Sequence, residues 1–98
     1  MKVVFGKSAL DKIYEKVCDV LKENNNKTIE YVILSEQEFE ECVIDVPLYN
    51  MVVINNSGTV SELFVHYGIY FIKQIPLDYA YIGMYEQILE KAKEYLND

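Results

Sequence analysis

The pattern of apolar positions divides the chain into strand-like and helix-like stretches. The clearest is residues 49–73, which holds short runs rich in Val, Ile, Tyr and Phe, interrupted at Asn55-Asn56-Ser57-Gly58 and at Tyr67-Gly68. Branched and aromatic residues favour strands, while Asn and Gly supply the positive φ angles of tight turns. This stretch predicts two or three antiparallel strands, against which the helices of the chain pack.

The pattern before this sheet predicts a strand, a helix and a second strand. The apolar run of residues 1–5 ends at Gly6 and is expected as a strand. Ser8 is a suitable N-cap, with Asp11 as its acidic partner, and an apolar stripe then recurs at helical spacing. The stripe consists of Leu10, Ile13, Tyr14, Val17 and Leu21. The helix is expected to end near Glu23, and residues 28–34 alternate as a second strand.

The pattern after residue 34 predicts two more helices on either side of the sheet segment. Ser35 and Glu38 form a capping box, which predicts a short helix of about seven residues. Residues 43–46 have extended character, and Pro47 limits them to an edge strand or a connection. After Pro76, a helix is expected from about Tyr79 to Leu96, with helical apolar spacing.

These elements predict one compact α+β domain over residues 1–98, in the order βαβ(α)βββα. Neighbouring elements usually pack together, so we expect both long amphipathic helices on one face of a small, antiparallel-rich sheet. The other face would be free for self-association.

Composition narrows the class of partner. The chain has 98 residues, a net charge of −7 and nine basic residues, all of them lysine. A negative field without arginine repels a phosphate backbone, so we expect no direct nucleic-acid binding and a protein partner with a basic surface. A content of 51% hydrophobic residues exceeds what so small a core absorbs, which favours a homo-oligomer, a dimer first. Two cysteines and no apolar run of about 20 residues predict a cytoplasmic protein outside the membrane.

Acidic residues on both long helices are candidate partner-binding residues. An acid stands at every fourth position: Asp11, Glu15, Asp19 and Glu23 on the first helix, and Glu86, Glu90, Glu94 and Asp98 on the last. The step of about 6 Å is comparable with the spacing of phosphates along a nucleic-acid strand, so one hypothesis is a surface that mimics DNA or RNA. The alternative is two ordinary solvated faces, balanced by lysines three positions away.

Tyrosines are the second group of candidates. Five of the nine lie within residues 67–85, and Tyr67, Tyr70, Tyr81 and Tyr85 are candidate contact residues. Tyrosine is enriched at interfaces because it combines a large contact area with a polar tip. The alternative is that these rings are half-buried parts of the scaffold.

The sequence predicts no catalytic, metal or cofactor site. Gly6-Lys7-Ser8 resembles the end of a phosphate-binding loop, but the position of the required first glycine is Met1. His66 has no acid, Ser or Cys at an informative spacing, and two cysteines with one histidine form no zinc set. We therefore expect a protein that is not an enzyme and needs no cofactor. Lys7 and Lys73 would be the phosphate contacts if the chain instead formed an oligomeric nucleotide-binding module.

Three stretches resemble small phage and prophage accessory proteins of low-GC Gram-positive bacteria. They are Gly6-Lys7-Ser8-Ala9-Leu10, Ile29-Glu30-Tyr31 and Leu34-Ser35-Glu36-Gln37-Glu38-Phe39, within roughly the first forty residues. The resemblance implies a small accessory protein that acts against a host system, and it carries over no catalytic residue. The leading hypothesis is an acidic interaction protein that binds and blocks a macromolecule, such as a host nucleic-acid-handling or defence protein. The alternatives are a small-molecule-binding oligomer and a virion or assembly component.

Overall fold

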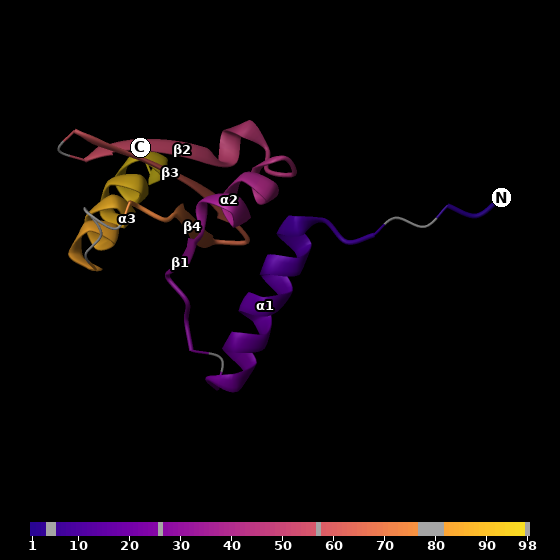
Figure 1. Ribbon diagram of the computed structural model, residues 1–98. Coiled ribbons are helices and arrows are strands. Elements are labelled where there is room, and N and C mark those ends of the chain that lie inside the picture. The colour runs from indigo at the N-terminus through magenta and orange to yellow at the C-terminus, as the bar shows by residue number, and fades with distance from the viewer. Residues whose placement is uncertain (4–5, 26, 57, 77–81, 98) are drawn as a thin grey trace.

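The computed structural model describes residues 1–3, 6–25, 27–56, 58–76 and 82–97, and within them three α-helices surround a four-stranded sheet (Figure 1). The order is α1 (Ala9–Glu23), β1 (Tyr31–Leu34), α2 (Glu36–Val43), the 3-10 turn η1 (Leu48–Asn50), β2 (Met51–Asn56), β3 (Thr59–His66), β4 (Ile69–Lys73) and α3 (Ile82–Asn97). The predicted α+β class is confirmed.

The sheet is mixed, with strand order β1-β4-β3-β2. β2, β3 and β4 form the predicted antiparallel meander, whereas β1 lies parallel to β4, with Tyr31 opposite Tyr70. Tyr67 and Gly68 both have positive φ, 50° and 75°, as a tight two-residue hairpin turn requires. The two edges of the sheet are therefore β1 and β2.

Helices cover both faces of the sheet, so the expectation of both long helices on one face is wrong. Leu10 and Val17 of α1 and Phe39 of α2 pack with Phe64 and Phe71 on one face. On the other face of the sheet, α3 packs through Tyr85, Ile88 and Ala92 against Leu63 and Ile72. The reason is visible in the sequence of the central strands, where the adjacent residues Leu63-Phe64 and Phe71-Ile72 place apolar side chains on both faces.

Three other expectations need correction. Residues 1–3 carry no strand, and residues 4–5 of the predicted first strand lie outside the described ranges. Residues 43–46 are not extended, because α2 continues to Val43 and turns follow. The strand predicted for residues 28–34 covers only Tyr31–Leu34.

The predicted helix boundaries agree with the structure where they can be compared. Ser8 and Ser35 are the N-caps of α1 and α2, and α1 ends at Glu23. For the last helix, residues 79–81 lie outside the described ranges and the helix extends to Asn97. Among the described residues, none of the helices has the length and apolar character needed to cross a bilayer.

Candidate functional site

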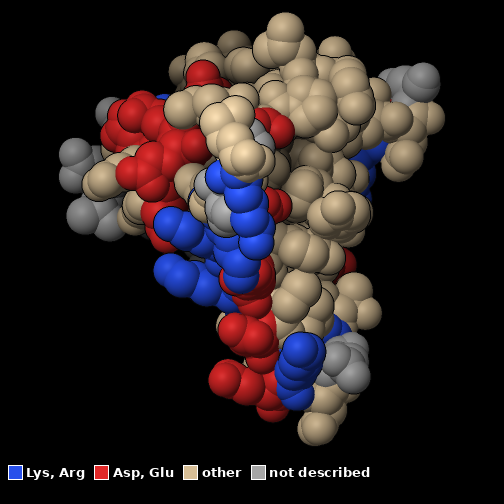
Figure 2. Space-filling model, turned by 90° about the vertical axis from the view of Figure 1, so that its right-hand side faces the viewer, with Lys and Arg blue, Asp and Glu red and all other residues tan. Residues whose placement is uncertain are grey.

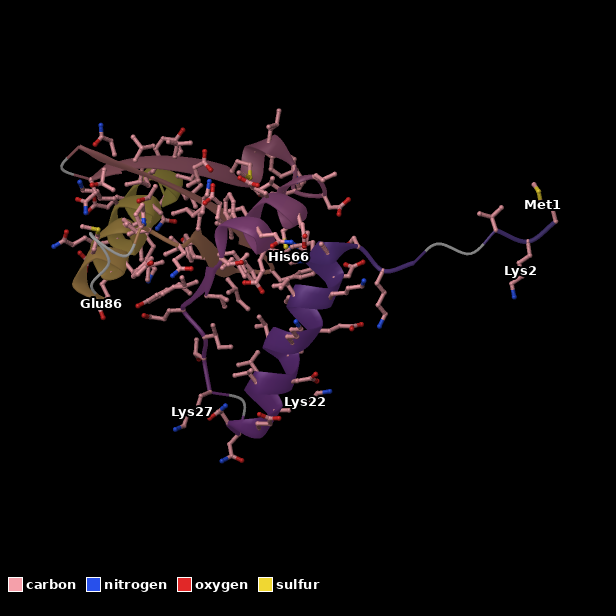
Figure 3. All side chains as sticks on the ribbon, viewed as in Figure 1. Met1, Lys2, Lys22, Lys27, His66 and Glu86 are labelled. Carbon is pink, nitrogen blue, oxygen red and sulfur yellow. The ribbon has the colours of Figure 1, made fainter. Side chains whose placement is uncertain are left out.

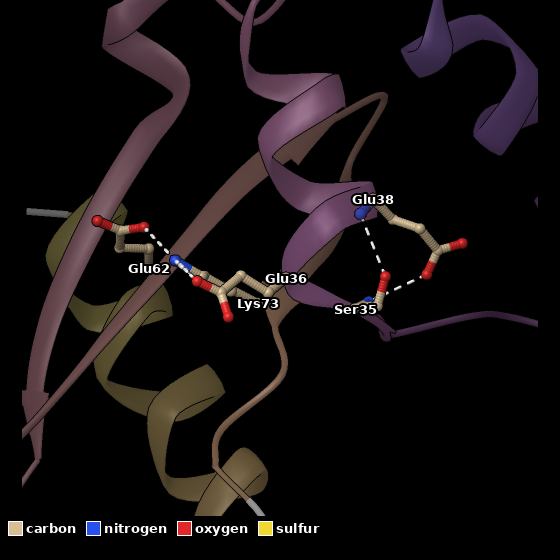
Figure 4. A network of polar contacts seen from close by, with 5 residues as sticks. All are labelled: Ser35, Glu36, Glu38, Glu62 and Lys73. Atoms are coloured by element: carbon tan, nitrogen blue, oxygen red, sulfur yellow. Dashed lines mark hydrogen bonds and ion pairs between the residues drawn. The ribbon is translucent and has the colours of Figure 1, made fainter.

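The corner between α2 and β2 is the strongest candidate for an interaction site, and it begins with a well-anchored helix. Glu38 N donates to Ser35 Oγ at 3.1 Å, and Ser35 N donates to Glu38 Oε1 at 3.0 Å, so the predicted capping box is complete (Figure 4). The hydrogen bond from the Ser35 backbone lowers the pKa of Glu38. Phe39 and Cys42 are buried and attach α2 to the sheet.

Local backbone hydrogen bonds fix the chain that follows α2. Asp45 N donates to Cys42 O at 3.1 Å, and Val46 N donates to Val43 O at 3.2 Å. Asn50 N then donates to Pro47 O at 2.9 Å within η1. Since Val46 is also buried in the core, this connection has a defined conformation with an anchor at its centre.

Three large apolar side chains of this connection point into solvent. Ile44, Leu48 and Tyr49 are 83%, 88% and 82% exposed. Large apolar groups that a fixed backbone holds in water are typical of contact surfaces, because ordering them costs little on binding. We call these three residues, together with the exposed acids Glu40, Glu41 and Asp45, the 44–49 corner.

The acids of the 44–49 corner belong to the most acidic stretch of the chain. Residues 36–45 contain Glu36, Glu38, Glu40, Glu41 and Asp45 and no basic residue. Within the described part of the chain, no lysine lies within ion-pair distance of Glu40, Glu41 or Asp45. Figure 2 shows a compact group of acidic side chains at the level of α2 and mainly uncharged surface above it. The corner therefore combines apolar contact area with negative charge.

Sequence reasoning missed this site because it expected residues 43–46 to be extended, as an edge strand or a connection. Two signals were available. The first is that five acids within ten residues is a higher density of acids than on either long helix. The second is that Ile44 does not share the helical spacing of Phe39 and Cys42, the residues of α2 that face the core.

The predicted acids of α1 are all exposed, but they do not form a purely negative surface. Asp11, Glu15, Asp19 and Glu23 follow the outer side of the helix, and Lys12, Lys16 and Lys22 are exposed beside them. Lys7 forms an ion pair with Glu15, which raises the pKa of Lys7. Figure 2 shows acidic and basic side chains intermixed toward the projecting lower end. This mixture is typical of a solvated helix face.

The acids of α3 lie away from those of α1. Glu86, Glu90 and Glu94 are exposed, and Asp98 lies outside the described ranges. Because α1 and α3 pack on opposite faces of the sheet, the two rows cannot line one continuous groove.

The candidate tyrosines have different environments. Tyr67 is exposed, and its ring centroid lies 4.9 Å from that of Tyr14 and 4.4 Å from that of His66. Tyr70 is half-buried against the core beneath α3, and Tyr81 lies outside the described residues. Tyr85 is 6% exposed, and its hydroxyl accepts a hydrogen bond from Ile75 N at 3.0 Å. Tyr85 is therefore part of the core and not of an outer contact surface.

His66 joins α1 to the sheet. Figure 3 labels it at the junction between the two, where its ring meets the edge of Tyr14 at a centroid distance of 5.3 Å and lies 6.4 Å from Phe71. Burial lowers the pKa of His66. Burial likewise raises the pKa of the Cys42 thiol, which keeps it protonated at neutral pH. Both environments are those of packing residues.

The two lysines proposed as phosphate contacts lie in separate places. Lys7 lines a hollow with Asp11, Tyr14, Glu15 and Tyr67. Lys73 lies between Glu62 at 3.5 Å and Glu36 at 3.9 Å, with its ammonium 6.0 Å from the Phe39 ring (Figure 4). Both ammonium groups therefore lie beside carboxylates, which would compete with a phosphate for them. Among the described residues, no group of His, Cys, Asp and Glu side chains has the geometry of a metal site.

Comparison of the chain with models of known protein families, with curated protein sequences and with solved structures gives no match.

Proposed function

We propose that this chain is a small, acidic, non-enzymatic interaction protein that binds and blocks a macromolecular partner through the 44–49 corner. The observation that carries the proposal is the presence of Ile44, Leu48 and Tyr49 in solvent on a backbone fixed by its own turns. The partner is a protein with an apolar pocket rimmed by basic side chains.

The two components of the corner have different roles in this interaction. Burial of a large apolar side chain contributes roughly 1.5–3 kcal/mol, so Ile44, Leu48 and Tyr49 supply most of the affinity. Glu40, Glu41 and Asp45 attract and orient a basic surface, which raises the association rate and excludes acidic proteins. Tyr49 adds a hydroxyl that can hydrogen-bond at the rim of the pocket.

The class of target follows from charge and from the resemblance of the first forty residues. The net charge of −7 favours a partner that normally holds a polyanion. Small phage and prophage proteins, which those residues resemble, act inside a host cell. A host nucleic-acid-handling or defence protein satisfies both conditions, and occupation of its basic surface would block it.

A nucleotide-binding oligomer is less well supported. Its two candidate phosphate contacts are each paired with carboxylates and line different hollows. A thermal shift of several degrees with any nucleotide would restore that alternative, because a ligand that binds only the folded state raises its stability.

The test is a comparative affinity capture from the lysate of the cells in which the gene occurs. Three tagged baits are used in parallel: wild type, a corner variant with Ile44→Ser, Leu48→Ser and Tyr49→Ser, and the control Tyr95→Ser. Tyr95 is also exposed and lies on α3, away from the corner. We expect wild type and control to recover the same basic protein and the corner variant to lose it. Equal recovery by all three baits would refute the corner as the binding site.

A further inference from the structure

Strand β1, one of the two edges of the sheet, lies beside an open apolar groove. The groove has a volume of about 460 Å³ and runs between α1 and β1. Its α1 wall includes Ile13, Val17 and Val20, and its β1 wall includes Val32 and Ile33. Val20 and Ile33 are exposed although they continue the apolar stripe of the helix and the pattern of the strand.

β1 also has backbone groups that face this open side. Tyr70 N donates to Glu30 O at 3.4 Å, and Gln74 N donates to Leu34 O at 2.7 Å. Alternate residues of a strand bond to opposite neighbours, so the N–H and C=O groups of Tyr31 and Ile33 point away from β4. An edge with free backbone groups and an apolar groove beside it is a template for another strand.

The N-terminal segment of the chain has the properties of such a strand. The sequence of residues 1–5 is Met-Lys-Val-Val-Phe, and the side chains of Met1 and Val3 are exposed. Extended, five residues span about 17 Å, which matches the four-residue edge of β1 with one residue to spare. The segment therefore offers apolar side chains to the groove and backbone N–H and C=O groups to the unpaired groups of the β1 edge.

The direction in which the N-terminal segment leaves α1 favours pairing with the β1 edge of a second copy of the chain. Figure 1 shows that the chain leaves the start of α1 on the side opposite to β1, and Figure 3 places Met1 and Lys2 far from the sheet. The segment of one copy is thus positioned to reach the groove of another, and a two-fold axis allows the same exchange in return.

We infer that the chain forms a dimer in which each copy adds its N-terminal segment as a strand to the β1 edge of the other, over the groove between α1 and β1. This inference does not depend on the proposed function, because none of the residues of the 44–49 corner lines the groove.

Size-exclusion chromatography with light scattering tests the inference on the full-length chain. Wild type should have twice the mass of the 11.5 kDa chain at micromolar concentration. Val3→Asp and Val20→Asp, one on each side of the contact, should each raise the dimer dissociation constant by at least about tenfold, because each places a charge in an apolar contact. The control is Val53→Asp on β2, where the valine is 63% exposed compared with 61% for Val3. The Val53→Asp variant should remain a dimer. The helical circular dichroism of all variants should be unchanged.

A cross-linking experiment identifies which chain contributes the strand. In a Cys18→Ser background, a tagged Val3→Cys chain is mixed with an untagged Ile33→Cys chain and oxidised. A disulfide between tagged and untagged chains is expected. A monomeric wild type, a dimer broken by Val53→Asp but not by Val3→Asp, or the absence of a disulfide between tagged and untagged chains would overturn the inference.

Discussion

At the scale of single residues, helix caps explain where two of the helices begin. Ser35 both donates and accepts in a complete capping box, whereas the side chain of Ser8 accepts one hydrogen bond, from Asp11 N. The difference matters because α2 carries Phe39 and Cys42 into the core and also positions the 44–49 corner.

Replacement of these caps should therefore have unequal effects. Ser35→Ala is expected to lower the free energy of unfolding by about 1 kcal/mol, and Ser8→Ala by roughly half of that. Each change removes one acceptor from a backbone N–H, but the hydrogen bond to Ser35 is partly buried whereas the hydrogen bond to Ser8 is exposed to water. Urea denaturation of the two variants beside wild type provides the measurement. A larger loss for Ser8→Ala would contradict the assigned role of α2.

His66 makes the stability of the fold dependent on pH. Burial lowers its pKa in the folded state, so the unfolded chain takes up the proton first as the pH falls. The contribution of the neutral ring is complete above the unfolded pKa of about 6.5 and decreases as the pH falls from there toward the folded pKa. The charged and titratable groups near the ring are Asp11 and the phenols of Tyr14 and Tyr67.

The prediction for His66 is a difference between two pH profiles. Between pH 7.5 and 5.5, wild type should lose more unfolding free energy than His66→Gln, since glutamine does not titrate. Chemical denaturation at both pH values gives the comparison. Parallel profiles, or a steeper loss in the variant, would show that His66 is not buried against α1 as described.

At the scale of elements, α3 forms a separate layer with its own core. Ile88 is fully buried beneath it, and Tyr85 ties the helix to the chain after β4 through Ile75 N. This packing is what removes Tyr85 from the set of candidate surface residues.

Two variants of α3 test this layer. Ile88→Ala should cost about 2–5 kcal/mol of unfolding free energy, and Tyr85→Phe about 1–3 kcal/mol, because it leaves a buried backbone N–H without an acceptor. Tyr95→Phe, at an exposed position of the same helix, serves as the control and should cost less than about 0.5 kcal/mol. Near-neutral effects of both core variants would mean that α3 does not cover the second face.

The elements also show how far the sequence predicts the fold. Caps and periodicity located α1, α2 and the three-strand meander, since these signals act within a few residues. The parallel pairing of β1 with β4 depends on contacts between distant segments, which local patterns do not encode. The division of the helices between two faces was readable from Leu63-Phe64 and Phe71-Ile72, where adjacent apolar residues require cover on both sides.

The candidate site was less predictable than the fold. The exposure of Tyr67 and of the acids on α1 and α3 was open to sequence reasoning, because charge and amphipathic spacing indicate an outer face. The 44–49 corner was not, since its importance depends on turns that hold Ile44, Leu48 and Tyr49 outward. Burial of Tyr85 and pairing of Lys73 likewise arise from tertiary packing.

At the scale of the whole molecule, the chain is less compact than a typical domain of its length and carries a negative net charge. The radius of gyration is 14.7 Å, larger than the roughly 13 Å of a compact chain of this length, and α1 with the N-terminus projects from the body (Figure 1). The net charge of −7 adds a long-range field of one sign.

This field predicts that partner binding depends on salt mainly through the association rate. Raising ionic strength from 0.05 to 0.5 M shortens the screening length several-fold, so the rate constant for association should fall by about tenfold or more while dissociation changes little. Surface plasmon resonance with the captured partner measures both rates. An association rate that salt leaves unchanged would argue against a basic partner.

Amide hydrogen exchange of the chain, alone and bound to its captured partner, tests whether the partner binds at the 44–49 corner. If the partner binds the 44–49 corner, binding should slow amide exchange over residues 40–50 and leave the amides of α1 and α3 unchanged. Slower exchange confined to α1, with residues 40–50 exchanging as in the free chain, would contradict binding at this corner.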